Sequence, residues 1–229
     1  MSNILTHIFD LFFPEECINC HKLLEIKGKY LCLFCLSEMP LTNFSFESDN
    51  ALEISFKGRV PIEAATALLY FEKKGMVQKL IHHLKFRNQT KIGQFLGHWL
   101  VKNMLMSQRF KDIDYVVPVP LHPIREKERG YNQVALFAQT IAKHMNATYI
   151  GDLLIKKHNR TTQIFKNRAD RIIEDKSSFI LNNTYSVAHK NILIVDDLIT
   201  SGATIESCSA PLLKHSGVRI SLASMAFAL

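Results

Sequence analysis

The alternation of apolar and polar residues along the chain predicts strands and helices in turn. Short aliphatic and β-branched runs bounded by turn-forming residues predict buried parallel strands, and apolar residues spaced three and four apart predict amphipathic helices. The predicted strands are 63–71, 115–120, 148–150, 153–155, 179–181, 192–195 and 218–227. The predicted helices are 4–13, 77–87, 92–104, 134–145 and 205–215. Strands that alternate with helices predict an α/β fold with a parallel sheet flanked by helices.

The pattern also divides the chain into three parts. Residues 1–40 hold a helix and two closely spaced cysteine pairs, and residues 61–229 hold the alternating strands and helices. Residues 41–60 are rich in polar and turn-forming side chains, which predicts a linker. A chain of 229 residues is long enough for one large core with a small appendage.

The segment 191–204 changes character abruptly. Its aliphatic run, 192–195, ends at two carboxylates, Asp196 and Asp197, and small residues follow: Thr200, Ser201, Gly202, Ala203 and Thr204. A tight loop that enters a helix presents backbone N–H groups to an anion, and glycine allows close approach. The carboxylates would accept hydrogen bonds from sugar hydroxyls, directly or through hydrated Mg²⁺. The segment therefore predicts a site for a ribose phosphate.

Other interpretations of the two carboxylates are weaker. A P-loop ATPase needs a G-x-x-x-x-G-K-[ST] segment, and a dinucleotide site needs G-x-G-x-x-G after a strand. The chain has neither. A general acid/base couple stays open, although nothing else in the sequence supports a hydrolase.

The cysteines predict a metal site. Cys17 and Cys20 form one C-x-x-C pair, Cys32 and Cys35 form another, and two such pairs bring four thiolates to one tetrahedral zinc ion. His21 could replace one sulfur, and a redox role is a further alternative, but two pairs so close together argue against it. A closed site of this kind would be structural.

Charge and composition change this picture only in part. The net charge of +7 favours anionic partners such as nucleotides or nucleic acid. No basic segment precedes the apolar residues 3–13, so no secretory signal is expected, and no apolar run reaches the roughly 18 residues of a membrane span. These features predict a cytoplasmic location with no membrane span.

Taken together, the motifs resemble a known family. The stretch I-L-I-V-D-D-L-I-T-S-G-A-T is similar to the phosphoribosyl-pyrophosphate motif of type I phosphoribosyltransferases. The wider set resembles the ComF family of competence proteins: the double C-x-x-C, Leu84-Lys85-Phe86, P-V-P-L-H at 118–122, R-G-Y-N-Q at 129–133, and the spacing of Gln163 and Arg171. This resemblance implies a zinc ribbon attached to a type I phosphoribosyltransferase-like domain, acting in natural transformation.

The resemblance also implies roles for particular residues. Segment 192–204 would bind the ribose phosphate, with Asp196 and Asp197 as the catalytic carboxylates. Pyrophosphate or the DNA backbone would meet Lys85, Arg129, Gly130, Asn132 and Arg171. The chain departs from the family pattern at Ser201, where threonine is usual, and at Glu174, where asparagine is usual. The Lys156–Gln163 loop also fits the pattern poorly, so Arg168 is an alternative to Arg171.

Three functions remain open on the sequence. A phosphoribosyltransferase would use phosphoribosyl pyrophosphate and Mg²⁺, mainly by positioning and charge stabilisation. A single-stranded DNA module would use the basic segments and their aromatic residues, Phe86 and Tyr131. An interaction protein would dock its zinc ribbon on a helicase-like competence partner. The family resemblance favours DNA handling, with an active transferase of nucleotide salvage as the alternative.

Overall fold

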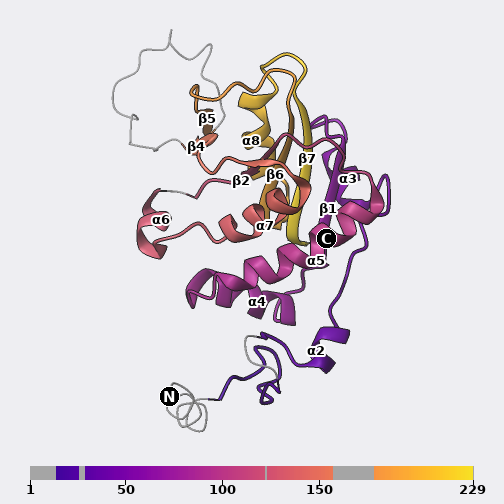
Figure 1. Ribbon diagram of the computed structural model, residues 1–229, viewed down its shortest axis with the longest axis vertical. Coiled ribbons are helices and arrows are strands. Elements are labelled where there is room, and N and C mark those ends of the chain that lie inside the picture. Colours follow the sequence, from indigo (N-terminus) through magenta and orange to yellow (C-terminus); the bar gives the residue numbers. More distant parts are fainter. Residues whose placement is uncertain (1–13, 26–28, 122, 157–177, 229) are drawn as a thin grey trace.

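Figure 1 shows the computed structural model, which describes residues 14–25, 29–121, 123–156 and 178–228. The predicted helix over residues 4–13 lies outside this part of the chain, as do residues 157–163 of the predicted basic loop, Arg168 and Arg171. Within the described ranges, no helix combines the length and the apolar character needed to cross a membrane.

A five-stranded sheet forms the centre of the molecule, in the order β1-β7-β6-β2-β3. Its strands are β1 (Ala64–Tyr70), β2 (Tyr115–Pro118), β3 (Thr148–Tyr149), β6 (Asn191–Ile199) and β7 (Arg219–Phe227). Every neighbouring pair in it runs parallel, whereas β4 (Leu154–Lys156) and β5 (Phe179–Leu181) form a separate antiparallel pair. The predicted α/β fold with a parallel sheet is therefore confirmed. β6, which carries the two aspartates, is the middle strand.

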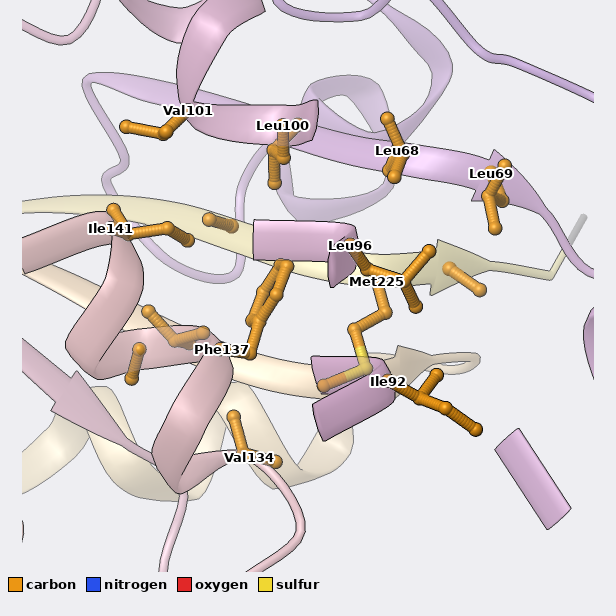
Figure 2. Packing of buried hydrophobic residues seen from close by; sticks show 14 of the residues in the cluster. Leu68, Leu69, Ile92, Leu96, Leu100, Val101, Val134, Phe137, Ile141 and Met225 are labelled. Carbon is orange, nitrogen blue, oxygen red and sulfur yellow. The ribbon is translucent and has the colours of Figure 1, made fainter. Parts of the chain in front are cut away.

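Helices cover both faces of this sheet (Figure 1). The helices of the described residues are α2 (Leu33–Ser37), α3 (Ala51–Phe56), α4 (Met76–Phe86), α5 (Lys91–Ser107), α6 (Pro123–Arg129), α7 (Ala135–Met145) and α8 (Ala203–Leu212), of which α2 and α6 lie away from the sheet. Helices α4, α5 and α7 share one buried apolar cluster, and α3 and α8 share a second cluster on the other face. Figure 2 shows part of the first cluster, where side chains of α5, α7, β1 and β7 meet.

The segment predicted as a linker, residues 41–60, instead packs against the sheet. It forms α3, and it buries Phe44 and Phe56 in the second cluster. The polar residues that suggested a linker are caps and turn anchors. Asn50 is the clearest case, because its Oδ1 accepts from the backbone N–H of Glu53 while its Nδ2 donates to three backbone carbonyls, that of Ala65 among them. Buried polar side chains that are fully hydrogen-bonded hold a segment in place.

Two element boundaries also differ from the prediction. The stretch 121–133, for which no helix was predicted between the strand 115–120 and the helix 134–145, contains helix α6, which begins at Pro123. Proline is favoured at the first position of a helix because its missing N–H is not needed there. The strand predicted to end at Val195 continues to Ile199, since pairing with β7 extends through Asp196↔Ser224 and Leu198↔Ala226.

Candidate functional site

The two aspartates of β6 point to opposite faces of the sheet. Ile192 and Ile194 belong to the cluster on the α8 face, while Leu193 and Val195 belong to the cluster on the α5 and α7 face. Side chains alternate along a strand, so Asp196 continues the first set and Asp197 the second. The carboxylates are adjacent in sequence, but they meet different partners.

Asp197 is buried, and two side chains from separate motifs bind its carboxylate, Lys85 as an ion pair and Gln133 as a hydrogen-bond donor. Lys85 Nζ, at the end of α4, lies 2.9 Å from Asp197 Oδ2 and 3.0 Å from Oδ1. Gln133 Nε2 donates to Asp197 Oδ2 over 2.6 Å. A buried carboxylate is stable only with partners of this kind. The structure thus brings the predicted Lys85 to the acid pair, and it adds Gln133, which ends the R-G-Y-N-Q motif but was not predicted as a site residue.

The turn between α6 and α7 carries three other predicted site residues. Arg129 Nη1 donates to Gln133 Oε1 over 2.8 Å, which links this arginine to Asp197 through the glutamine amide. Asn132 is used within the turn: its Nδ2 donates to Val119 O over 3.1 Å, and its Oδ1 accepts from Val134 N over 3.0 Å. Gly130 adopts a φ of 74° at the bend.

Asp196 has a different environment. It is half-buried, and its Oδ1 accepts from the backbone N–H of Asp197 over 2.8 Å. Burial and the neighbouring Asp197 charge raise the pKa of Asp196 to about 8, although Lys85 and Lys156 oppose the shift. Asp196 and residues 198–205 line a small hollow of about 30 Å³. This carboxyl group therefore lies beside the predicted anion-binding loop.

The loop itself is shaped by contacts with α3. Gly202 is the N-cap of α8 with a φ of 76°, and a Cβ at this position would lie 2.7 Å from the ring of Phe56. Arg59, which follows α3, donates through Nη1 to Ser201 O over 2.8 Å and pairs with Glu206 at 2.8 Å. Thr200, Ser201, Ala203 and Thr204 are exposed, so the loop is open to a ligand.

Arg59 is a site residue that the sequence did not reveal. It lies in the segment predicted as a linker, 142 residues before Ser201. Its charge borders the loop that was expected to hold an anion, and its only sequence signal is an arginine within a polar stretch. A contact made across such a distance in the chain leaves no local pattern.

A cleft of about 620 Å³ opens beside Lys85, the residue that pairs with Asp197. It is lined by Lys85, Phe86, Asn88, Arg125, Glu128, Arg129 and Tyr131. Lys85 and Arg129 therefore face this cleft and also belong to the hydrogen-bonded group around Asp197.

The four predicted cysteine ligands come together. The Sγ atoms of Cys17, Cys20, Cys32 and Cys35 all lie within 4.8 Å of one another. Thiolates at about 2.3 Å from a tetrahedral zinc ion would lie roughly 3.8 Å apart, so the cluster has the right size to hold a metal ion. Burial raises the pKa of Cys17, but hydrogen bonds from the backbone N–H groups of Cys20, Cys32 and Asn19 outweigh it and lower the pKa to about 6. The low pKa of Cys17 favours its thiolate, the form that binds metal, whereas burial raises the pKa of Cys35 to about 12.

Helix α4 contacts both the cysteine cluster and the acid pair. Lys79 Nζ donates to the backbone oxygen of Asn19 over 2.9 Å and to its Oδ1 over 3.0 Å. Asn19 Nδ2 in turn lies 3.4 Å from Cys35 Sγ. The side chain of Lys85, on the same helix, extends to Asp197. Helix α4 is therefore connected to the cysteine cluster through Asn19 and to the aspartates of β6 through Lys85.

No protein-family model matches the chain. Competence protein F of Haemophilus influenzae is 25% identical over 218 residues, which cover 90% of this chain and 94% of that protein. The chain is a homologue of competence protein F. The resemblance predicted from the motifs is therefore confirmed.

Two further homologues match a shorter part of the chain. DNA utilization protein YhgH of Escherichia coli K12 is 28% identical over 144 residues, covering 62% of this chain and 63% of that protein. Competence protein ComFC of Bacillus subtilis is 29% identical over 141 residues, covering 61% and 54%. The matched part spans just under two thirds of the first protein and about half of the second.

Solved structures with a likeness to this chain include two enzymes. UMP synthase of Leishmania donovani aligns with a TM-score of 0.35 and 15% identity, over 65% of this chain and 24% of that chain. A hypoxanthine phosphoribosyltransferase from Staphylococcus aureus aligns with a TM-score of 0.31 and 14% identity, over 78% and 71%.

Proposed function

We propose that the chain handles incoming single-stranded DNA during natural transformation, and that its sheet domain binds a ribose phosphate. Homology with competence protein F over 90% of the chain supports the first part. The net charge of +7 suits an anionic partner. The proposal implies a cytoplasmic location, and it assigns one zinc ion to the cysteine cluster of residues 1–40.

The observation that carries the ribose-phosphate site is the position of Asp196. Its carboxyl group borders the hollow formed by residues 198–205, where α8 begins. The N-terminus of a helix attracts a phosphate, and the carboxyl group of Asp196, protonated or ionised, forms hydrogen bonds with hydroxyl groups. A ligand that satisfies both groups carries a phosphate and sugar hydroxyls. Phosphoribosyl pyrophosphate is such a ligand.

Magnesium would enter with this ligand. Mg²⁺ is usually held by one or two carboxylates together with substrate phosphates. Asp196 is the group best placed to hold it, in exchange for the proton that its raised pKa retains, since Asp197 is already engaged by Lys85 and Gln133. Lys85 and Arg129 would supply positive charge beside the pyrophosphate, and Arg171 would do the same if its segment approaches the site.

An active phosphoribosyltransferase is the second candidate. The cleft of about 620 Å³ beside Lys85 favours it, because this cleft is large enough to hold an acceptor base. Catalysis would then rest on positioning and on charge stabilisation of the leaving pyrophosphate. Release of pyrophosphate from phosphoribosyl pyrophosphate that depends on an added nucleobase would establish this activity.

A thermal-shift experiment tests the ribose-phosphate site. Phosphoribosyl pyrophosphate with Mg²⁺ should raise the melting temperature of the wild-type protein, because a ligand of the native state stabilises it. Asp196→Asn should lose most of this shift. Asp49→Asn, at an exposed aspartate outside the site, should retain it. Equal shifts in the two variants would contradict the site.

Binding to single-stranded DNA tests the remaining part of the proposal. Affinity should fall steeply as salt rises from about 50 to about 200 mM, because each phosphate contact releases a counterion. An affinity that does not change over this range, or no binding at all, would refute DNA handling by this chain alone.

A further inference from the structure

An exposed aromatic ring lies in the cleft beside the acid pair. Phe86 is the last residue of α4, and 62% of it is exposed, although the face of α4 that packs on the sheet is complete without it. Exposure of a phenyl ring to water is unfavourable, so an exposed ring in a cleft is a candidate for contact with a ligand. The neighbouring cleft residues Arg125 and Arg129 are basic, and Glu128 is the acidic residue among them.

The Phe86 ring contacts a histidine and an arginine. The ring centroid of His82, one turn earlier on α4, lies 4.9 Å from that of Phe86. The guanidinium of Arg129 lies 5.1 Å from the Phe86 centroid. Tyr131 donates from its hydroxyl to Leu84 O over 2.6 Å, which ties the turn after α6 to the end of α4. Both walls of the cleft are therefore fixed relative to each other.

We propose that this cleft binds an unstacked nucleobase of single-stranded DNA against Phe86, with Arg125 and Arg129 on the adjoining phosphates. The inference rests on the proposed DNA-handling function and assigns it a surface. Proteins that bind single strands combine aromatic platforms for the bases with cations along the backbone. Phe86 provides the first element, and the arginines of the cleft provide the second.

The size and chemistry of the cleft favour a single strand over other ligands. A volume of about 620 Å³ suits one or two nucleotides. A DNA duplex hides the faces of its bases, so it offers nothing to stack on Phe86. A small inorganic anion would contact the arginines alone, and the exposed Phe86 ring would have no ligand to contact. Base–aromatic stacking is generally stronger than an exposed cation–π contact, so a base can displace the Arg129 guanidinium from the ring.

Displacement of Arg129 would change the hydrogen bonds around Asp197. Arg129 donates to Gln133, and Gln133 donates to Asp197. A base on Phe86 therefore acts on the same hydrogen-bonded group that Lys85 completes. Occupation of the cleft and of the ribose-phosphate site would be coupled through Gln133.

The test uses the full-length protein and three DNA ligands of equal length. These are oligothymidylate, an abasic strand with the same phosphates, and a duplex. The wild type should bind oligothymidylate more tightly than either of the other two. Phe86→Ala should weaken oligothymidylate binding about tenfold and leave abasic binding unchanged, because it removes the stack and keeps the charges. Phe46→Ala, at an exposed phenylalanine outside the cleft lining, should bind as the wild type does.

Phe86→Trp adds a direct measurement. The wild type has one tryptophan, Trp99, which serves as the background signal. Oligothymidylate should quench the fluorescence of Phe86→Trp, and the abasic strand should not. If wild type and Phe86→Ala bind oligothymidylate equally, or if the abasic strand quenches equally, the proposed cleft is wrong while DNA handling survives. If the wild type binds no strand at all, the proposed function fails together with the cleft.

Discussion

Gln133 donates from Nε2 to Asp197 Oδ2 over 2.6 Å, and its Oε1 accepts from Arg129 Nη1 over 2.8 Å. One amide thus satisfies a buried carboxylate and holds an arginine of the neighbouring cleft. Lys85 reaches the same carboxylate from α4. Side chains from two separate motifs therefore meet at Asp197, which belongs to a third.

Replacing this amide should destabilise the protein. We expect Gln133→Leu to lower the free energy of unfolding by about 1–3 kcal/mol, because Asp197 loses a partner in a buried position. Urea denaturation measures the change. Gln94→Leu, at an exposed glutamine of α5, should stay within about 0.5 kcal/mol of the wild type. If the two variants unfold at the same urea concentration, the amide does not support the carboxylate.

The raised pKa of Asp196 predicts a dependence of stability on pH. Burial and the charge of Asp197 raise this pKa to about 8, whereas an aspartate in an unfolded chain titrates near 3.9. The folded state then binds the proton more tightly, so this group stabilises the fold at low pH. Its contribution falls as pH rises from about 4 to about 8.

Asp196→Asn isolates this effect, since asparagine does not ionise. Relative to the variant, the wild type should lose at most about 1.4 kcal/mol of unfolding free energy per pH unit across that window. Urea denaturation at about pH 5 and about pH 8 compares the two proteins. Parallel profiles would show that the carboxyl group is ionised in the fold at both pH values.

The contact between Gly202 and Phe56 can be measured against a matched glycine. Gly58 has a φ of 75°, close to the 76° of Gly202, but a Cβ at Gly58 would meet nothing within 4 Å. Gly58→Ala should therefore cost about 1–2 kcal/mol for the left-handed backbone alone. Gly202→Ala should cost about 1–3 kcal/mol more, because the methyl group collides with the Phe56 ring. Equal losses of unfolding free energy would mean that the ring yields without cost.

The cysteine cluster predicts one zinc ion per chain. Metal analysis of the purified protein should find it, and Cys17→Ser should remove it and destabilise residues 14–40. Cys208→Ala is the control, because Cys208 is a buried cysteine of α8 outside the cluster and its loss should leave the zinc content unchanged. Well-folded Cys17→Ser protein without zinc would contradict a structural role for the metal.

The sequence predicted the sheet because aliphatic runs such as 192–195 mark buried strands without help from the rest of the chain. It also predicted the cysteine cluster, since the four sulfurs are close in sequence as well as in space. It did not predict that Asp196 and Asp197 would meet different partners. That division follows from the continuation of β6 to Ile199, which depends on pairing with β7.

The errors arose where polar residues serve tertiary structure. Asn50 resembles a linker residue until its four hydrogen bonds, to Phe44, Glu47, Glu53 and Ala65, are seen. Arg59 and Gln133 were missed as site residues for a related reason, because their partners Ser201 and Asp197 are far away in the chain. Local pattern carries no information about such contacts.

The support that Phe56 and Arg59 give to the loop limits what protein engineering can do with this motif. Residues 191–204 contain the strand, both carboxylates and the glycine, yet the wall against which the turn closes belongs to α3. Grafting these residues onto another parallel sheet would transfer the hydroxyl groups without the surface that shapes them. A graft that keeps the shape of the loop would need α3 and Arg59 as well. The site must therefore be transferred as two segments that are far apart in the sequence.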